Sequence, residues 1–506
     1  MHEHERSIPQ VYRNLSFLIF LLCLAALTGC MVGPNFQRPQ QSVPARWSGP
    51  LPPPPSQPAT TEEEELARWW TVFEDQTLTS LLERAVQGNL DLKLAEARIR
   101  QARAARGVAA STLGPTVDAT GSYSRRQLPG SSLDENAKGP TTNQYQAGFD
   151  AAWELDIFGG IRRNIESADA NVQAAAENRR DVLVTLTAEV ARNYIDLRAF
   201  QQRIAIAQKN LQVQQHSAKL TRQRFEFGFV SGLDVATAEA QVATTAAVIP
   251  LLEAQARQSI YNLSVLLGRD PAALVQELSP ALAIPVAPPS VPVGVPSDLL
   301  RRRPDIRRAE AGIHSATAQI GVATADLFPR FFLFGSGGYQ AAKLGSWFEP
   351  AGLFWSIGPS VSWPVFDMGR IRSNIEVQKA LTEQSVIVYR QTVLAALQET
   401  ENALIASAKE QEHRKSLVDA VAANRKAVDL ALKLYTEGLT DFLNVLEAQR
   451  SLFVTEDALV QSNGTVSTSL VALYKALGGG WDLQEEEEDK TLTVGKASGR
   501  TPAAQR

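Results

Sequence analysis

The sequence has few of the residues from which disulfides, metal sites and catalytic centres are built. Its 506 residues include two cysteines, three methionines and five histidines. Both cysteines, Cys23 and Cys30, lie near the start of the chain, so we expect no disulfide in the rest of it. The histidines show neither a metal-ligand spacing nor the pattern of a catalytic triad. We therefore predict no metal site, no cofactor and no enzymatic activity.

An excess of one charge and a long apolar run in the body of the chain are also missing. The formal net charge is −4, with 44% hydrophobic and 21% charged residues. So small a net charge gives no reason to expect a nucleic-acid partner. No apolar run in the body approaches the roughly 20 residues that a transmembrane helix needs. The body is therefore not predicted to cross a membrane as a helix.

One shorter apolar run, at residues 15–27, follows two arginines near the N-terminus. A basic flank, a short apolar core and small residues at the cleavage point are typical of an export signal peptide, which we place at residues 1–29. The run closes with Leu-Thr-Gly-Cys, which resembles a bacterial lipobox. We therefore expect Cys30 to carry covalent lipid and to become the mature N-terminus, followed by Met31 rather than by the aspartate of an inner-membrane retention signal. The alternative is an ordinary secretory signal in which the cysteine occurs by chance.

The body of the chain contains two copies of one unit. Residues 91–115 align without gaps with residues 305–329, and the shared residues include alanines, glycines and a proline. Further matched pairs are Gly159 with Gly369, Ile161 with Ile371, Arg162 with Arg372, Gly228 with Gly438, and Val235 with Val445. Chance similarity between two helical sequences would not be expected to match glycine and proline in this way, so we infer an internal repeat. We place the copies at residues 75–270 and 298–478, with a Pro-rich linker at 271–297.

Each copy is predicted to contain a helix, two strands, a very long helix, a tight turn and a return helix. The first helix is expected at residues 76–113, where Gly114 and Pro115 follow. In the first copy the long and return helices are expected at about 161–227 and 233–267. Their counterparts in the second copy are expected at about 370–437 and onward to Leu477. A helix of about 65 residues is about 100 Å long, and helices of this length usually pack as coiled coils.

The predicted strands alternate between apolar and polar residues. They lie at about 115–125, 145–158, 329–340 and 352–366. The second strand has Asp150, Glu154 and Asp156 at alternate positions, between apolar and aromatic residues. Alternation over about ten residues is typical of an outer-membrane barrel, with apolar side chains toward lipid and polar ones toward the lumen. A half-buried sheet of a water-soluble protein would show the same alternation.

The number of strands bears on the assembly. Four strands per chain cannot close a barrel, and an open sheet edge is not viable in lipid. Barrels have about eight strands or more, so several chains must contribute to one barrel. Three chains would supply twelve strands. The predicted fold class is an α+β membrane protein in which a trimeric 12-stranded β-barrel is continuous with a long α-helical tunnel.

Four stretches of the chain carry specific motifs: residues 30–39 (CMVGPNFQRP), 300–306 (LRRRPDI), 358–372 (GPSVSWPVFDMGRIR) and 473–481 (LYKALGGGW). Together they resemble the TolC-type outer-membrane efflux channels, and among them the lipoprotein members that serve resistance-nodulation-division pumps. The resemblance covers residues 30–482. It implies a homotrimer lipid-anchored in the Gram-negative outer membrane, with a large periplasmic extension. Segments 30–74 and 479–506 would lie around the equator of that extension, and the last residues are predicted to be disordered.

In such a family the protein is a passive exit duct. A resistance-nodulation-division pump in the inner membrane and a periplasmic adaptor protein deliver the cargo, and outer-membrane lipid surrounds the barrel. The sequence itself does not indicate the cargo. On this interpretation Asp150, Glu154 and Asp156 would face the barrel lumen.

The resemblance also implies a gate at the periplasmic helix turns, in the second copy. The gate stretch contains Tyr435, Leu443, Asn444, Glu447 and Arg450. Leu443 would form an apolar constriction, Glu447 an acidic ring, and Arg450 a latch with an acidic neighbour. Asn444 stands where some members have aspartate. Alternatively, Glu447 and Arg450 are ordinary solvated helix charges.

The adaptor is expected to dock in grooves between the two helix turns. The docking residues would be Gly228, Ser231, Gly232, Asp234, Gly438 and Thr440. The alternative is that these residues only form the turns. Two other functions remain open: a TolC-like channel for type I protein secretion, and a structural periplasmic coiled-coil lipoprotein. The second would not explain four alternating strands in register with the repeat.

Overall fold

The computed structural model describes residues 31–50, 66–128, 139–286 and 293–481. The predicted signal peptide and Cys30 lie outside the described residues, as does the acidic run near the C-terminus. The chain forms two compact units, each built from three separate segments. The described part of the first unit is 31–40, 98–175 (with its gap) and 308–389. The second unit takes the remaining described residues.

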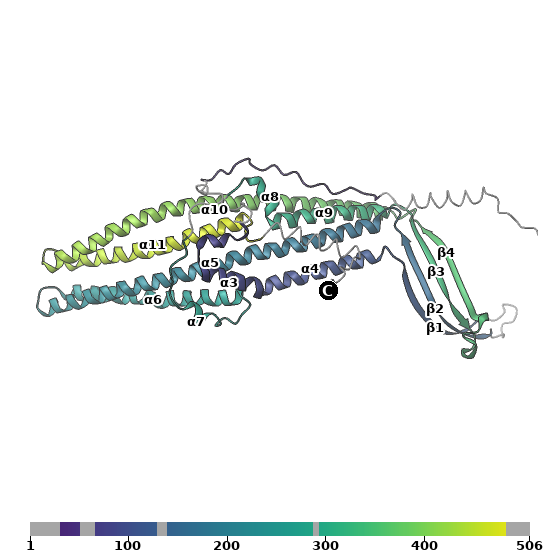
Figure 1. The fold of residues 1–506 in the computed structure, drawn as a ribbon, viewed down its shortest axis with the longest axis horizontal. Coiled ribbons are helices and arrows are strands. Elements are labelled where there is room, and N and C mark those ends of the chain that lie inside the picture. The colour runs from purple at the N-terminus through teal and green to yellow at the C-terminus, as the bar shows by residue number, and fades with distance from the viewer. Residues whose placement is uncertain (1–30, 51–65, 129–138, 287–292, 482–506) are drawn as a thin grey trace, which may run out of the picture. The chain divides into compact units, whose positions relative to one another are not determined.

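The first unit contains one antiparallel sheet of four strands in the order β1-β2-β3-β4 (Figure 1). The strands are β1 (Thr116–Gln127), β2 (Thr141–Leu155), β3 (Arg330–Ala341) and β4 (Leu353–Ser362). Each copy of the repeat supplies two neighbouring strands. Two short 3-10 turns, η3 (Leu344–Ser346) and η4 (Pro350–Gly352), lie between β3 and β4. β4 ends earlier than the predicted 366, because Pro364 has no N–H group with which to continue the ladder.

The pairing of β2 with β3 joins the two copies and depends on glycine. A Cβ atom on Gly148 would lie 2.6 Å from the carbonyl oxygen of Gly337, and one on Gly338 would lie 2.3 Å from that of Ala147. The other long edges of β1 and β4 have no partner strand among the described residues. Pro359 lies in β4, an edge strand of the single-chain sheet, where proline is tolerated.

Helices precede and follow the strands in the same way in both copies. Helices α4 (Leu90–Ser111) and α9 (Pro304–Ala325) lead into the strands, and α5 (Gly160–Glu226) and α10 (Arg370–Thr436) leave them. The two long helices have 67 residues each, which corresponds to about 100 Å. Their predicted bounds differ from these by one residue at each end or less.

The predicted single helix at 76–113 is wrong in one respect. The structure has two helices, α3 (Gln76–Gly88) and α4, separated at Asn89. The Asn89 side chain accepts a hydrogen bond from the Leu92 N–H and donates one to the Leu266 carbonyl, both at 2.9 Å. A Cβ atom on Gly88 would lie 2.2 Å from the carbonyl oxygen of Leu267. The helix is therefore interrupted where the end of a second helix, at Leu266 and Leu267, approaches it. Local periodicity does not reveal this long-range contact.

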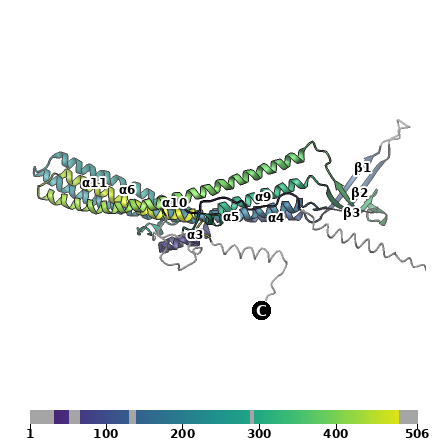
Figure 2. The ribbon, with the colours of Figure 1, turned by 90° about the horizontal axis from the view of Figure 1, so that it is seen from above.

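The second unit is dominated by two helical hairpins (Figures 1 and 2). One pairs the distal part of α5 with α6 (Gly232–Leu266), and the other pairs the distal part of α10 with α11 (Phe442–Ala476). The second unit also contains α3 and four short elements: η1 (Trp69–Phe73), α7 (Val275–Leu278), η2 (Pro296–Asp298) and α8 (Leu299–Arg302). Figure 2 shows the turn ends of the two hairpins side by side.

The last described residue, Trp481, fixes the end of the second copy onto the first. The guanidinium groups of Arg180 and Arg307 lie 4.8 and 5.3 Å from the centre of its ring. Both arginines also contact the buried carboxylate of Glu177, at 2.6 and 2.9 Å. A buried charge needs such partners, so this cluster holds the C-terminal segment in one position.

Candidate functional site

The sheet has one apolar face that nothing covers within the described part of the chain. Trp355 and Phe149 on this face are 75% and 65% exposed. Val117, Ile357 and Val361 are also exposed there. A water-soluble sheet would bury such a face, and monomeric soluble proteins rarely expose so large an apolar patch. The exposure favours contact with lipid over the half-buried soluble sheet.

Aromatic residues mark the two ends of this apolar face. At one end the Tyr145 ring lies 4.8 Å from that of Tyr123 and 6.2 Å from that of Trp347. At the other end the indole N–H of Trp153 donates to the Leu113 carbonyl at 2.8 Å. Eight residues separate Tyr145 from Trp153, which is about 26 Å along the strand and about 20 Å across a membrane at the usual strand tilt. Two aromatic girdles at this spacing fit the interfaces of an outer membrane.

The second copy repeats the aromatic contact of the girdle that contains Trp153. The indole N–H of Trp363 donates to the Leu327 carbonyl at 3.0 Å, as that of Trp153 does to Leu113 in the first copy. In each case a helix end fixes the ring beside the sheet. Each copy of the repeat therefore fixes one tryptophan of this girdle in the same way.

The opposite face of the sheet is polar. Asp118 and Asp150 stand directly opposite one another on β1 and β2, and the Thr120 hydroxyl donates to Asp150 at 2.9 Å. Glu154 lies on the same face, with the Arg330 Nε atom 3.9 Å from its carboxylate. Sequence reasoning missed Asp118, although it occupies a polar position in the weaker alternation of the first strand.

Asp156 does not belong to this polar face, so its assignment to β2 with Asp150 and Glu154 is wrong. β2 ends at Leu155, and the Asp156 carboxylate accepts hydrogen bonds from the Ile161 and Arg162 N–H groups at 3.1 and 3.0 Å. It caps α5. Asp367 caps α10 in the second copy, accepting from Gly369 and Ile371 N–H groups. The hydrogen bond from the Ile371 N–H is the main cause that lowers the pKa of Asp367.

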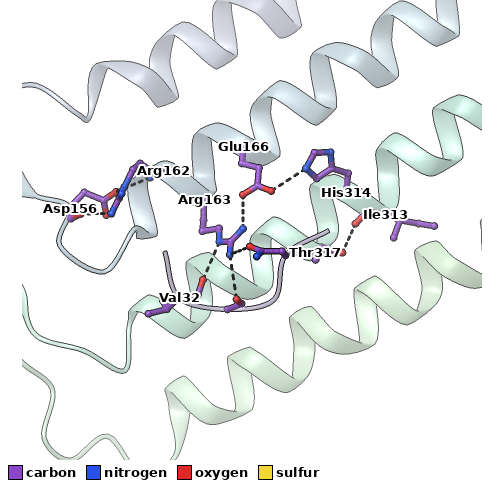
Figure 3. Close-up of polar contacts among 10 residues, drawn as sticks. Val32, Asp156, Arg162, Arg163, Glu166, Ile313, His314 and Thr317 are labelled. Carbon is purple, nitrogen blue, oxygen red and sulfur yellow. Dashed lines mark hydrogen bonds and ion pairs between the residues drawn. The ribbon is translucent and has the colours of Figure 1, made fainter. Parts of the chain in front are cut away.

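A buried arginine holds the first described residues against the helices (Figure 3). Arg163 is 2% exposed and donates to the carbonyls of Val32 and Gly33 at 3.1 and 3.3 Å. It also donates to Asn35 Oδ1 and to a carboxylate oxygen of Glu166, both at 2.7 Å. No sequence pattern singled out Arg163, because all of its acceptors except Glu166 lie about 130 positions away along the chain.

The same cluster continues through Glu166 to His314 and Phe36. His314 Nε2 lies 3.1 Å from the second Glu166 oxygen, and the Phe36 ring stacks on the imidazole with centroids 4.4 Å apart. The Val32 N–H donates to the Phe158 carbonyl at 3.1 Å. Residue 31 is thus held at the junction between β2 and α5. Cys30, one residue earlier in the sequence, lies outside the described residues.

The segment after this clamp is held at a second point. The Glu401 carboxylate accepts hydrogen bonds from the Ser48 and Gly49 N–H groups at 2.8 and 2.9 Å. Burial by itself would raise the pKa of Glu401, but these backbone bonds outweigh it and lower the pKa. The Trp47 indole donates to the Gly294 carbonyl at 3.1 Å.

The two helix turns share one backbone geometry. Gly228 and Gly438 both have positive φ angles, of 73° and 77°. In the first turn the Phe229 N–H donates to the Arg224 carbonyl, and in the second Leu439 donates to Leu434, each at 2.9 Å. This is the usual glycine-dependent end of a helix.

The predicted docking residues of the first turn have a structural task. Ser231 and Asp234 form a reciprocal capping box at the start of α6, which begins at Gly232. The Ser231 N–H donates to the Asp234 carboxylate at 2.9 Å. These bonds account for the residue types at these positions and leave docking itself as a prediction.

The predicted gate residues fall into two groups. Tyr435 is 2% exposed and packs with Phe442, Val445 and Ala238. The Arg224 guanidinium lies 4.5 Å from the Tyr435 ring and donates to its carbonyl at 2.7 Å. Tyr435 therefore connects the two hairpins instead of facing outward.

The other gate residues lie exposed along one face of α11. They are Leu443, Asn444, Glu447 and Arg450. The Asn444 amide donates to the Thr440 hydroxyl at 2.8 Å. Among the described residues, Glu447 and Arg450 form no hydrogen bond or ion pair, so the proposed latch has no partner within one chain.

Comparison with known proteins decides the family. The family model described as outer membrane efflux protein matches residues 81–269 and 295–479. The chain belongs to this family. It is 33% identical over 460 residues to nodulation protein T of Rhizobium leguminosarum bv. trifolii, covering 90% of this chain and 96% of that protein. It is 32% identical over 484 residues to the toluene efflux pump outer membrane protein TtgC of Pseudomonas putida, covering 95% and 98%.

Solved structures agree with this assignment. The outer-membrane channel OprN has a TM-score of 0.81 at 38% identity and covers 89% of this chain and all of that one. The Campylobacter jejuni CmeC outer membrane channel matches in fold, with a TM-score of 0.83 at 21% identity over 92% and 98% of the two chains. These findings confirm the predicted fold class, with a strand barrel and a helical tunnel. This outer membrane efflux protein is a Gram-negative outer-membrane channel component and not an enzyme.

Proposed function

We propose that three copies of this chain form the exit duct of a tripartite efflux pump. The observation that carries the proposal is the sheet, which has an uncovered apolar face, a polar face and two unpaired edges. Pairing β4 of one copy with β1 of the next would remove every edge and give twelve strands from three chains of four. The polar face would then line the lumen, with Asp118, Asp150 and Glu154 giving it acidic character.

The helices support the same assembly. Among the described residues one helix, α6, is long and apolar enough to cross a membrane by length and composition, and only 17% of its most apolar window is buried. Leu251 and Val265 on it are exposed, as are Val377 and Leu394 on α10. In the proposed trimer the apolar faces of these helices pack against neighbouring copies and form the tunnel wall.

The lipid anchor belongs to the same proposal. Lipid on Cys30 would leave the chain two residues before Val32, the first residue of the Arg163 clamp, at the end of β2 that carries Trp153. The lipid anchor and the aromatic girdle that contains Trp153 would then lie at the same membrane interface. The covalent lipid would be the only non-protein group that the duct requires.

The gate and the partners complete the proposal. The exposed face of α11 with Leu443, Glu447 and Arg450 would meet its copies at the three-fold axis and close the duct. A periplasmic adaptor would dock at the two helix turns and link the duct to an inner-membrane resistance-nodulation-division pump. The names of relatives include toluene efflux and pyoverdine export, which supports small organic molecules as cargo.

The test is to reconstitute the purified, acylated protein in planar bilayers after measuring its molar mass in detergent. We expect a trimer with a small conductance that rises in Glu447→Ala or Arg450→Ala. A conductance that neither variant changes would keep the duct and exclude this gate. A monomer without conductance would favour the coiled-coil scaffold, and passage of an unfolded polypeptide would favour type I secretion.

A further inference from the structure

A cavity of about 430 Å³ lies in the first unit, where β2 runs into α5 and α9 runs into β3. Neither the proposed gate nor the lipid anchor uses it. Its volume is within the range of pockets for small organic molecules. The lining residues that matter here are Glu154, Phe158, Asp326, Arg330 and Phe332.

The aromatic walls of this junction cavity are held in place. The Phe158 ring stacks on Phe328 with centroids 4.5 Å apart, and the Phe332 ring stacks on Phe334 at 5.8 Å. Rings that are fixed before a ligand arrives lose little conformational entropy on binding.

The carboxylates of the cavity are not equivalent. Asp156 is occupied by the N-terminus of α5 and by the guanidinium of Arg162. Asp326 forms an ion pair with Arg330. Glu154 accepts no hydrogen bond among the described residues, and its nearest cationic atom is Arg330 Nε at 3.9 Å. Its side chain is 32% exposed, so it is accessible to a ligand in the cavity.

A single under-coordinated carboxylate in a cavity that is also lined by two stacked aromatic residues, Phe158 and Phe332, suits an organic cation. The carboxylate attracts the positive charge, and ring faces stabilise a flat or partly desolvated cation. A small divalent metal ion would instead require several oxygen ligands, which Glu154 alone does not supply. Phe332 and Glu154 are directly opposite on the polar face of the sheet.

We propose that the junction cavity is a resting site for aromatic monocations on the wall of the duct. This inference rests on the proposed function, because the polar face of the sheet lines a lumen only in the assembled trimer. A cation held at Glu154 replaces the long contact with Arg330. Weak binding of this kind leaves the site reversible, as passage requires.

The probe is ethidium, an aromatic monocation, applied to the acylated trimer. Binding is measured by fluorescence anisotropy in lipid nanodiscs and by blockade of single channels in planar bilayers. We expect saturable binding and brief current blockades, whereas tetraethylammonium, which lacks aromatic rings, blocks far less. Glu154→Gln should weaken ethidium binding about fivefold, in line with a partly exposed charge pair. Arg330→Gln should strengthen it, because the competing cation is gone.

The matched control is Asp118→Asn, which makes the same charge change on the same face of the sheet outside the cavity. It should alter binding less than about twofold. Equal weakening by Asp118→Asn and Glu154→Gln would mean general attraction by the lumen and would overturn the site. Conducting channels that ethidium neither binds nor blocks would overturn the site and leave the duct intact. Absence of a trimer and of conductance would overturn both.

Discussion

The two helix turns share one backbone geometry but differ in the side-chain contacts that stabilise them. In the first turn, Ser231 and Asp234 close a capping box, so that α6 begins with its N–H groups satisfied locally. In the second turn Asp441 occupies the corresponding position without a side-chain cap, and Asn444 bonds to Thr440 instead. The first turn is therefore held by local bonds.

The two turns also differ in whether their aromatic side chains are exposed or buried. The first turn exposes Phe227 and Phe229, at 76% and 72%. The second turn buries Tyr435 and Phe442, whose rings lie 5.4 Å apart and pack on the first hairpin. The second turn is thus held by tertiary contacts with the first hairpin, whereas the first turn has a local capping box and presents exposed apolar surface. In the proposed duct the second turn is suited to move and the first to dock.

The largest effect is expected from Tyr435→Ala. Removing a buried aromatic side chain costs about 3–5 kcal/mol, and here the loss falls on the contact between the two hairpins. Single-channel conductance should rise several-fold as the second turn loosens. Tyr435→Phe is the control, since the Tyr435 hydroxyl is buried without a hydrogen-bond partner among the described residues and its removal should be nearly neutral. Similar conductance in Tyr435→Ala and the parent would contradict a mobile second turn.

The next effect concerns docking at the first turn. Phe227→Ser and Phe229→Ser together remove exposed apolar surface without touching the capping box. Binding of the periplasmic adaptor from the same organism should weaken about tenfold, because burial of each large apolar side chain contributes about 1.5–3 kcal/mol when complete. Leu439→Ser in the second turn is the matched control and should weaken binding much less. The reverse order of effects would assign docking to the second turn.

The sequence predicted the elements that local pattern controls. Glycines and prolines at matching positions revealed the repeat, and strict alternation located β2. The prediction failed for two different reasons. Asn89 breaks a helix against the end of α6, a contact over 177 positions that has no local pattern. Asp156 caps α5 through N–H groups only five and six residues further along, a local signal that the alternation of the strand obscured.

The site residues show the same division. Exposed positions on α11 follow from helical spacing, but Tyr435 also contacts Ala238 and Arg224 of the first hairpin, and Arg224 is 211 residues away in the chain. The Arg163 clamp likewise joins residues separated by 131 positions or nearly so. Contacts of this kind require the fold, because their partners share no local sequence signature.

A smaller effect should separate the two caps. Ser231→Ala removes the capping bond of α6 and should cost about 1 kcal/mol. Hydrogen exchange at the first amides of α6 should then accelerate about fivefold, since local opening becomes easier by that free energy. Asp441→Ala should change exchange at the start of α11 less than about twofold, because its side chain makes no capping bond. Equal acceleration of hydrogen exchange at the starts of α6 and α11 would contradict the inference that only the first turn has a stabilising side-chain cap.

The smallest effect is expected when the capping-box residues of the first turn are introduced into the second turn. Asp441→Ser with Asn444→Asp places the capping-box pair at the positions that correspond to Ser231 and Asp234. If local bonds can replace tertiary packing, exchange at the start of α11 should slow by a factor of about two to five. The same double variant should partly offset the rise in conductance of Tyr435→Ala, since a turn held by its own cap depends less on the ring. Slower exchange without any such offset would mean that conductance is controlled by the hairpin contact alone, and that the cap governs only the turn.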